Sequence, residues 1–283
     1  MEYKNKLIGY NELFNDLLKL FHKNLLPNKL LLNGKKGIGK FIFTYHFVNY
    51  ICSENEEYKY NLEDNVIDDR NKSYQLFKKN IHPNIFLIKK KDESKFIDVS
   101  QIRDMIKFQN SSSFNNENKF IIIDNISDLN LNSSNALLKS IEEPNNKVFY
   151  ILTYNTGSFL LDTIKSRCIE FKIFLNQTSQ KKIINDHFSD NIYESISTDL
   201  VNFYSNPSFL ISLINYLNEQ SLNYNTATIE NVINLIIKNR DYTKNTFIKE
   251  NINFFVELFF YKNINLTNRI NYNIKKYFFL KLN

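Results

Sequence analysis

The sequence predicts an α/β fold with a parallel sheet, followed by a region made of helices. Three observations lead to this prediction. The stretch 119–168 shows an apolar run, a helical pattern and a second apolar run, and strands joined through a helix lie parallel. A glycine-rich loop at 34–41 stands between an apolar run and a helix, where phosphate-binding loops occur. Beyond residue 175 the apolar residues recur at helical spacing.

The composition indicates a globular protein. The 283 residues are enough for two or three domains, and 43% of them are hydrophobic. The net charge of +6 fits either a nucleic-acid neighbour or a lysine-rich coding bias. Cys52 and Cys168 suggest no disulfide framework, which favours a reducing compartment. Neither a signal peptide nor a membrane span is recognisable, so we expect a cytoplasmic protein without a membrane partner.

Two strands and three helices are expected before residue 118. Phe14, Leu17, Leu18 and Phe21 have helical spacing within residues 1–28. The other elements are strands at 29–32 and 85–88 and an aromatic helix at 41–52. A third helix, with Asp98 or Ser100 as its cap, is expected to carry Val99, Ile102, Arg103 and Ile106. The acidic segment 53–80 is interpreted as a solvated surface insertion, and His82 as a loop residue rather than a metal ligand.

Three further strands complete a five-stranded sheet, and helices make up the rest of the chain. The strands are expected at 120–123, 148–152 and 168–174. The helices are expected at 135–143, 183–188, 192–203, 207–217, 229–237, 247–260 and 266–280.

The loop at 34–41 fits the phosphate-binding pattern G-x-x-x-x-G-K-[ST] at every position but the last. Gly34, Gly37 and Gly39 would let backbone N–H groups point at phosphate oxygens, and Lys40 would reach the outer phosphates. Phe41 stands where a hydroxyl group would hold Mg²⁺. Two interpretations stay open, a vestigial site that binds ATP and Mg²⁺ weakly, and a glycine-rich turn that binds no nucleotide.

A second departure from working phosphate-loop ATPases follows the strand at 120–123. Asp124 ends the strand at 120–123, where an acidic residue of phosphate-loop ATPases helps to hold Mg²⁺. The next residue, where a glutamate would activate water, is Asn125, and an amide cannot accept the proton. Phe41 and Asn125 therefore both indicate a chain that does not hydrolyse ATP on its own.

Two motifs resemble those of bacterial clamp-loader subunits, which belong to the AAA+ superfamily. They are the sequence N-A-L-L-K-S-I-E-E-P at 135–144 and the triplet Ser166-Arg167-Cys168. The resemblance extends over about residues 6–175, including His82-Pro83 and the stretch 98–103, and is weak beyond. It implies an AAA+ P-loop α/β domain at 1–174, a small helical lid domain at 175–220 and a C-terminal helical collar domain at 221–283.

The resemblance also implies a function. Clamp loaders are rings of five subunits that use ATP to place a sliding clamp on primed DNA. The chain is similar to the non-hydrolysing stator subunit of the DNA polymerase III complex, whose partners are gamma/tau and delta subunits. Arg167 matches the arginine that acts in trans on the ATP of a neighbouring subunit, and a planar, permanently charged guanidinium suits that task. Ser166 and Cys168 would position the turn, and an ordinary salt bridge is the alternative role for Arg167.

Two other functions compete with the stator role. A self-sufficient AAA+ ATPase, of the gamma/tau type or a helicase loader, conflicts with Phe41 and Asn125. A plain nucleic-acid-binding module is disfavoured because the basic residues are spread along the chain. The gamma-type relatives carry a four-cysteine zinc module after the phosphate-loop helix, whereas residues 53–81 contain no cysteine, so no zinc is expected.

Overall fold

The computed structural model describes residues 4–91, 94–112, 117–142, 147–201 and 205–263. The chain divides into two compact units, Met1–Ser179 and Gln180–Asn283. The division of the second unit into a lid and a collar domain stays a prediction.

A parallel sheet of five strands forms the centre of the first unit, as the sequence predicted. Its order is β2-β3-β4-β1-β5, and every pairing is parallel. The strands are β1 (Lys29–Gly34), β2 (Ile85–Ile88), β3 (Lys119–Ile123), β4 (Val148–Asn155) and β5 (Ile169–Lys172). Because the strands run in the same direction, the loops after β1, β3 and β4 meet at one edge of the sheet.

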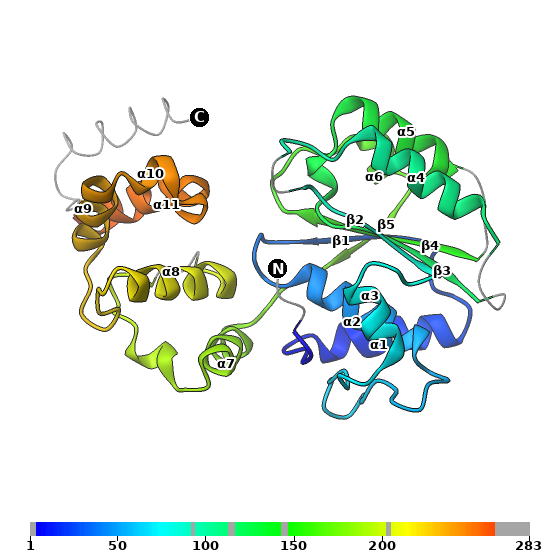
Figure 1. Cartoon of the computed structure of the whole chain (residues 1–283), viewed down its shortest axis with the longest axis horizontal. Coiled ribbons are helices and arrows are strands. Elements are labelled where there is room, and N and C mark those ends of the chain that lie inside the picture. Colours follow the sequence, from blue (N-terminus) through cyan, green and yellow to red (C-terminus); the bar gives the residue numbers. More distant parts are fainter. Residues whose placement is uncertain (1–3, 92–93, 113–116, 143–146, 202–204, 264–283) are drawn as a thin grey trace. The chain divides into compact units, whose positions relative to one another are not determined.

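Helices cover both faces of this sheet. Figure 1 shows α1, α2 and α3 on one face and α4, α5 and α6 on the other. Their bounds are α1 (Asn11–His22), α2 (Lys40–Cys52), α3 (Lys72–Lys78), α4 (Val99–Asn110), α5 (Leu131–Glu142) and α6 (Asp162–Lys165), with a 3-10 turn η2 (Ile126–Asp128) before α5. All five residues of β3 are buried, which explains why residues 120–123 form a continuous apolar run rather than an alternating pattern.

The two faces are filled differently. Aliphatic side chains of β3, β4, α4 and α5 fill one core, including the fully buried Ile121, Leu137 and Ile141. Aromatic rings fill the other, where Phe14 of α1 meets Phe43 of α2 edge to face at 5.9 Å between ring centroids. Most of α2 is buried, which explains why residues 41–52 are largely aromatic and apolar although they form a helix.

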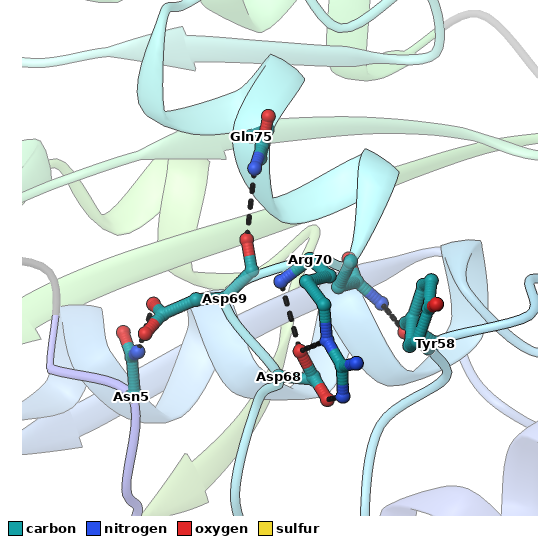
Figure 2. A network of polar contacts seen from close by, with 7 residues as sticks. Asn5, Tyr58, Asp68, Asp69, Arg70 and Gln75 are labelled. Carbon is teal, nitrogen blue, oxygen red and sulfur yellow. Dashed lines mark hydrogen bonds and ion pairs between the residues drawn. The ribbon is translucent and has the colours of Figure 1, made fainter.

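The segment 53–80 differs in part from its interpretation as a solvated insertion. Its acidic side chains are largely exposed, but apolar side chains of the same segment are buried and attach it to the first unit: Tyr60, Ile67, Tyr74 and Phe77. Figure 2 shows how Arg70 pairs with Asp68, with 2.7 Å between Nη2 and Oδ2. The Arg70 guanidinium also lies 4.1 Å from the centroid of the Tyr58 ring.

The second unit is helical, as predicted. Its elements are α7 (Gln177–Phe188), which begins in the first unit, η3 (Ile192–Ser195), α8 (Pro207–Glu219), α9 (Ile229–Asn239), α10 (Asp241–Lys244) and α11 (Thr246–Asn263). A shared core holds Ile184, Leu213, Val232 and Phe255, each no more than 1% exposed. The helix expected at 266–280 lies outside the described residues.

The prediction of a helix at 192–203 was wrong over most of its length. Within the described residues 192–201, only a short 3-10 turn forms, at the start. The chain then bends so that the Asp199 carboxylate accepts a hydrogen bond from the backbone N–H of Ile229 (2.7 Å), at the start of α9. Ile196 and Leu200 still enter the core, so their spacing reflects burial rather than a helix. Phe203 lies outside the described residues.

None of the helices in the described part of the chain is both long and apolar enough to cross a membrane.

Candidate functional site

The loop between β1 and α2 lies at the carboxyl edge of the sheet. Gly34 ends β1 opposite Asn155, the last residue of β4. A Cβ atom on Gly34 would lie 2.5 Å from the backbone oxygen of Ile173, so no side chain fits there. Gly37 and Gly39 have positive φ angles of 78° and 94°, a conformation that glycine adopts at little cost. These three positions therefore need glycine to shape the loop, whether or not a phosphate binds.

Lys40, the first residue of α2, turns its ammonium group back into this loop. Its Nζ donates hydrogen bonds to the backbone oxygens of Gly34 (2.8 Å) and Lys35 (2.7 Å) and to Oδ1 of Asn155 (2.7 Å). An ammonium carries three N–H groups, so all three have partners. Burial lowers the pKa of Lys40 to about 8, and the nearby Asp124 carboxylate opposes this shift. Lys40 therefore stabilises the loop from within.

A chain of polar side chains connects β3, β4 and the loop. Thr153 Oγ1 donates to Asp124 (3.0 Å) and accepts from the backbone N–H of Asn125 (2.7 Å). Asn125 has a left-handed backbone with φ of 59°, and its Oδ1 accepts from Asn155 Nδ2 (3.1 Å). Burial raises the pKa of Asp124, while the hydrogen bond from Thr153 and the charge of Lys40 oppose this. The structure thus brings Lys40, Asp124 and Asn125 together, as their sequence positions suggested.

Sequence reasoning missed Thr153 and Asn155. Both belong to the carboxyl end of β4, next to β1 and β3. The available signal was a polar residue at the end of an apolar run, at the sheet edge where ligands of α/β proteins bind.

Phe41 contributes hydrocarbon where a magnesium-binding loop would contribute oxygen. The Phe41 side chain is buried, and its ring stacks against Tyr45 and Phe77 with 6.5 Å between centroids in each pair. Tyr10 braces the same loop, because its buried hydroxyl donates a hydrogen bond to the backbone oxygen of Ile38. The donor set here does not fit a magnesium ion.

Arg167 contacts a different pair of elements, α5 and α6. Its Nη2 lies 2.6 Å from Oε1 of Glu142, and its Nη1 donates to the backbone oxygen of Thr163 (2.9 Å). The Arg167 side chain remains 37% exposed. The salt bridge considered as its alternative role is therefore present, while the guanidinium still reaches solvent.

The neighbours of Arg167 shape the turn. Ser166 is the C-cap of α6, and its hydroxyl donates to the Thr163 oxygen (3.2 Å). Cys168 is 8% exposed, and burial raises the pKa of its thiol to about 11, so it stays protonated near neutral pH. These properties suit positioning better than covalent chemistry.

His82 has the partners of a structural loop residue. Its Nδ1 accepts from the backbone N–H of Asn84 (3.2 Å), and Nε2 lies 3.3 Å from the Ser73 hydroxyl. Burial lowers its pKa to about 4, so the ring is neutral. Over the described ranges, no group of three or more His, Cys, Asp or Glu side chains is placed to hold a metal ion.

Comparison with known proteins places the first unit in a family. The family model described as "DNA polymerase III, delta subunit" matches residues 9–176, more than half of the chain. The chain belongs to this family. The α/β fold that the resemblance implied is present, as a five-stranded parallel sheet with helices on both faces (Figure 1).

Individual relatives support the same family. The chain is 31% identical to a DNA polymerase III subunit delta' of Pseudomonas aeruginosa over 140 residues, 50% of this chain and 41% of the relative. It is 26% identical to the Bacillus subtilis subunit delta', covering 62% of this chain and 51% of the relative. It is 25% identical to a Buchnera aphidicola subunit gamma, covering 82% of this chain and 62% of the relative. The chain thus spans less than two thirds of each of these relatives.

Both subunit types are therefore represented among the similar proteins. The family resemblance establishes a clamp-loader relative of DNA polymerase III. The choice between the two types depends on the residues of the site.

Proposed function

We propose that this chain is the delta prime (stator) subunit of the DNA polymerase III clamp loader. In this role it assists the ATP-dependent loading of the sliding clamp on primed DNA and hydrolyses no ATP itself. The observation that carries the proposal is the contrast between two positions. Phe41 fills the place of the magnesium ligand with a stacked ring, whereas Arg167 is exposed to solvent.

The chain's own loop supports a non-hydrolysing subunit. Lys40 has its three N–H groups engaged by loop carbonyls and Asn155. Phe41 supplies no oxygen for a metal ion, and Asn125 supplies no base for water. A phosphate would have to displace the partners of Lys40 without any compensating metal contact. The loop is best explained as a degenerate phosphate-binding loop that keeps a structural task.

Arg167 would act on a neighbouring gamma/tau subunit. ATP with Mg²⁺, bound by that neighbour, supplies the phosphoryl group and the cation that neutralises it. The Arg167 guanidinium would place fixed positive charge beside the phosphoryl oxygens as negative charge develops in the transition state. Arginine keeps its proton at every physiological pH, so this contribution needs no proton transfer.

The partners follow from this role. They are the gamma/tau and delta subunits directly, and the sliding clamp and primed DNA through the assembled hetero-oligomer. The chain would then work at the replisome, near the nucleoid.

The test uses Arg167→Ala in a complex reconstituted with gamma and delta subunits. We expect DNA- and clamp-stimulated ATP hydrolysis at the adjacent site to fall by about 10³-fold or more. Arg70→Ala is the matched control, because Arg70 is also an exposed arginine paired with a carboxylate (Figure 2). Unchanged hydrolysis in the assembled Arg167→Ala complex would remove the proposed role in trans.

A further inference from the structure

Glu142 meets Arg167 from the last described turn of α5. The two charged groups are 2.6 Å apart, and the guanidinium has its second anchor at the Thr163 carbonyl of α6. Glu142 belongs to α5, whereas Arg167 lies in the turn between α6 and β5, and both β4 and α6 separate the two residues in the sequence. A planar guanidinium held at two of its nitrogen atoms has a defined orientation as well as a defined place.

We infer that Glu142 is the positioning residue for Arg167. This inference rests on the proposed function of Arg167 in trans. The carboxylate of Glu142 holds the guanidinium in the orientation in which it meets the phosphoryl group of the neighbour's ATP. Glu142 itself touches neither nucleotide nor metal.

The support beneath Glu142 is rigid. The preceding residue, Ile141, is fully buried in the aliphatic core. Before it, the Ser140 hydroxyl lies 2.7 Å from the Tyr150 hydroxyl, and both bond to Gln109 of α4. Buried, satisfied polar networks of this kind fix the position of a helix. Glu142 is thus the exposed end of a well-anchored turn.

The charges suit positioning better than stabilisation of the fold. Exposed ion pairs contribute little to stability, and the Glu142 side chain is 52% exposed. A carboxylate near the C-terminal end of a helix is also disfavoured by the helix dipole, and the guanidinium of Arg167 offsets this. A guanidinium has five N–H donors, so it can keep both anchors and still donate to phosphate oxygens.

The first experiment separates binding from catalysis. In the reconstituted complex, Glu142→Ala should lower the kcat of the stimulated ATPase by roughly tenfold to hundredfold, the usual effect of misplacing a catalytic group by about 1 Å. KM for ATP should change by less than about twofold, because a group that acts in the transition state contributes little to ground-state binding. Glu142→Asp should restore most of the kcat, since it returns the carboxylate.

The second experiment asks whether Glu142 acts through Arg167. In the Arg167→Ala background, adding Glu142→Ala should cause no further loss of kcat. A merely structural role would cost activity in both backgrounds. Asp16→Ala is the control, because Asp16 is an exposed carboxylate that pairs with Lys19 at 3.0 Å on α1. Assembly of every variant is checked by size-exclusion chromatography.

The outcomes distinguish the two proposals. If Arg167→Ala lowers kcat and Glu142→Ala does not, the positioning role is wrong and the role of Arg167 stands. A rise in kcat for Glu142→Ala would mean that the carboxylate masks the arginine, which also overturns the inference. If Arg167→Ala itself has no effect, the proposed function fails first.

Discussion

The ammonium of Lys40 lies 2.7 Å from the side-chain oxygen of Asn155, the residue that ends β4 beside the phosphate loop. This bond ties the start of α2 to the neighbouring strand. Together with the hydrogen bonds to the two loop carbonyls, it engages all three N–H groups of Lys40, so the ammonium stabilises the loop in the absence of a bound phosphate.

Lys40 should give the protein a distinctive stability profile at alkaline pH. Its folded pKa of about 8 lies below the ordinary lysine value of 10.5, so the unfolded chain holds this proton more tightly. Stability from this group therefore rises as pH increases above 8. Between pH 7.5 and 9.5 the wild type should gain about 2 kcal/mol relative to Lys40→Met, measured by urea unfolding. Parallel pH profiles for the two proteins would contradict the burial of a charged Lys40.

Phe41→Thr should restore a hydroxyl without restoring an ATPase. The change removes a buried, stacked ring, which should lower the free energy of unfolding by about 3 kcal/mol. Isolated Phe41→Thr should show no ATP turnover, because Asn125 still supplies no base. Thermal unfolding and a phosphate-release assay measure the two effects, with Phe41→Leu as the apolar control. Turnover that disappears when Lys40→Ala is added would revive the gamma-type ATPase.

His46 should make the protein less stable in mild acid. The ring is fully buried, with Nδ1 3.0 Å from the Tyr60 hydroxyl and Nε2 2.9 Å from the Lys4 carbonyl. Burial lowers its pKa to about 4, against 6.5 for an unperturbed histidine. Between pH 6.5 and pH 4, His46 therefore binds a proton in the unfolded chain but stays neutral in the folded protein. The free energy of unfolding falls as the pH drops through this range.

The expected size of this loss is about 3 kcal/mol at pH 4 relative to pH 7. Urea unfolding of the wild type and His46→Gln across this range isolates the contribution of one ring. The variant should be less stable at pH 7 but should show a flatter profile. Equal slopes would mean that His46 is protonated in the folded protein.

Much of the sheet could be predicted because buried strands consist of consecutive apolar residues, and such runs are visible in the sequence. The strand at Ile85–Ile88 was predicted at its observed bounds, and β3 within one residue. The helix after the phosphate loop needed the motif as well, since Phe41, Phe43 and Tyr45 by composition favour a strand. Local pattern failed at Ile196 and Leu200, where burial in a bent segment imitates helical spacing.

The site was only partly predictable, for a related reason. Motifs identify single positions, such as Lys40 and Arg167, but tertiary contacts decide their partners. Thr153 contacts Asp124, and Asn155 contacts Lys40, because β4 lies between β1 and β3 in the sheet. Glu142 meets Arg167 because α5 and α6 cover the same face (Figure 1). Neither pairing has a signature in the spacing of the residues.

The segment 53–80 also determines the order in which the protein can be assembled during synthesis. Lys6 forms an isolated antiparallel β-bridge with Val66, and the backbone N–H of Ile67 donates a hydrogen bond to the Asn5 carbonyl at 2.8 Å. Residues near Asn5 leave the ribosome long before Ile67 does. The backbone groups of Asn5 and Lys6 therefore stay without these partners until residues 66–67 have been synthesised.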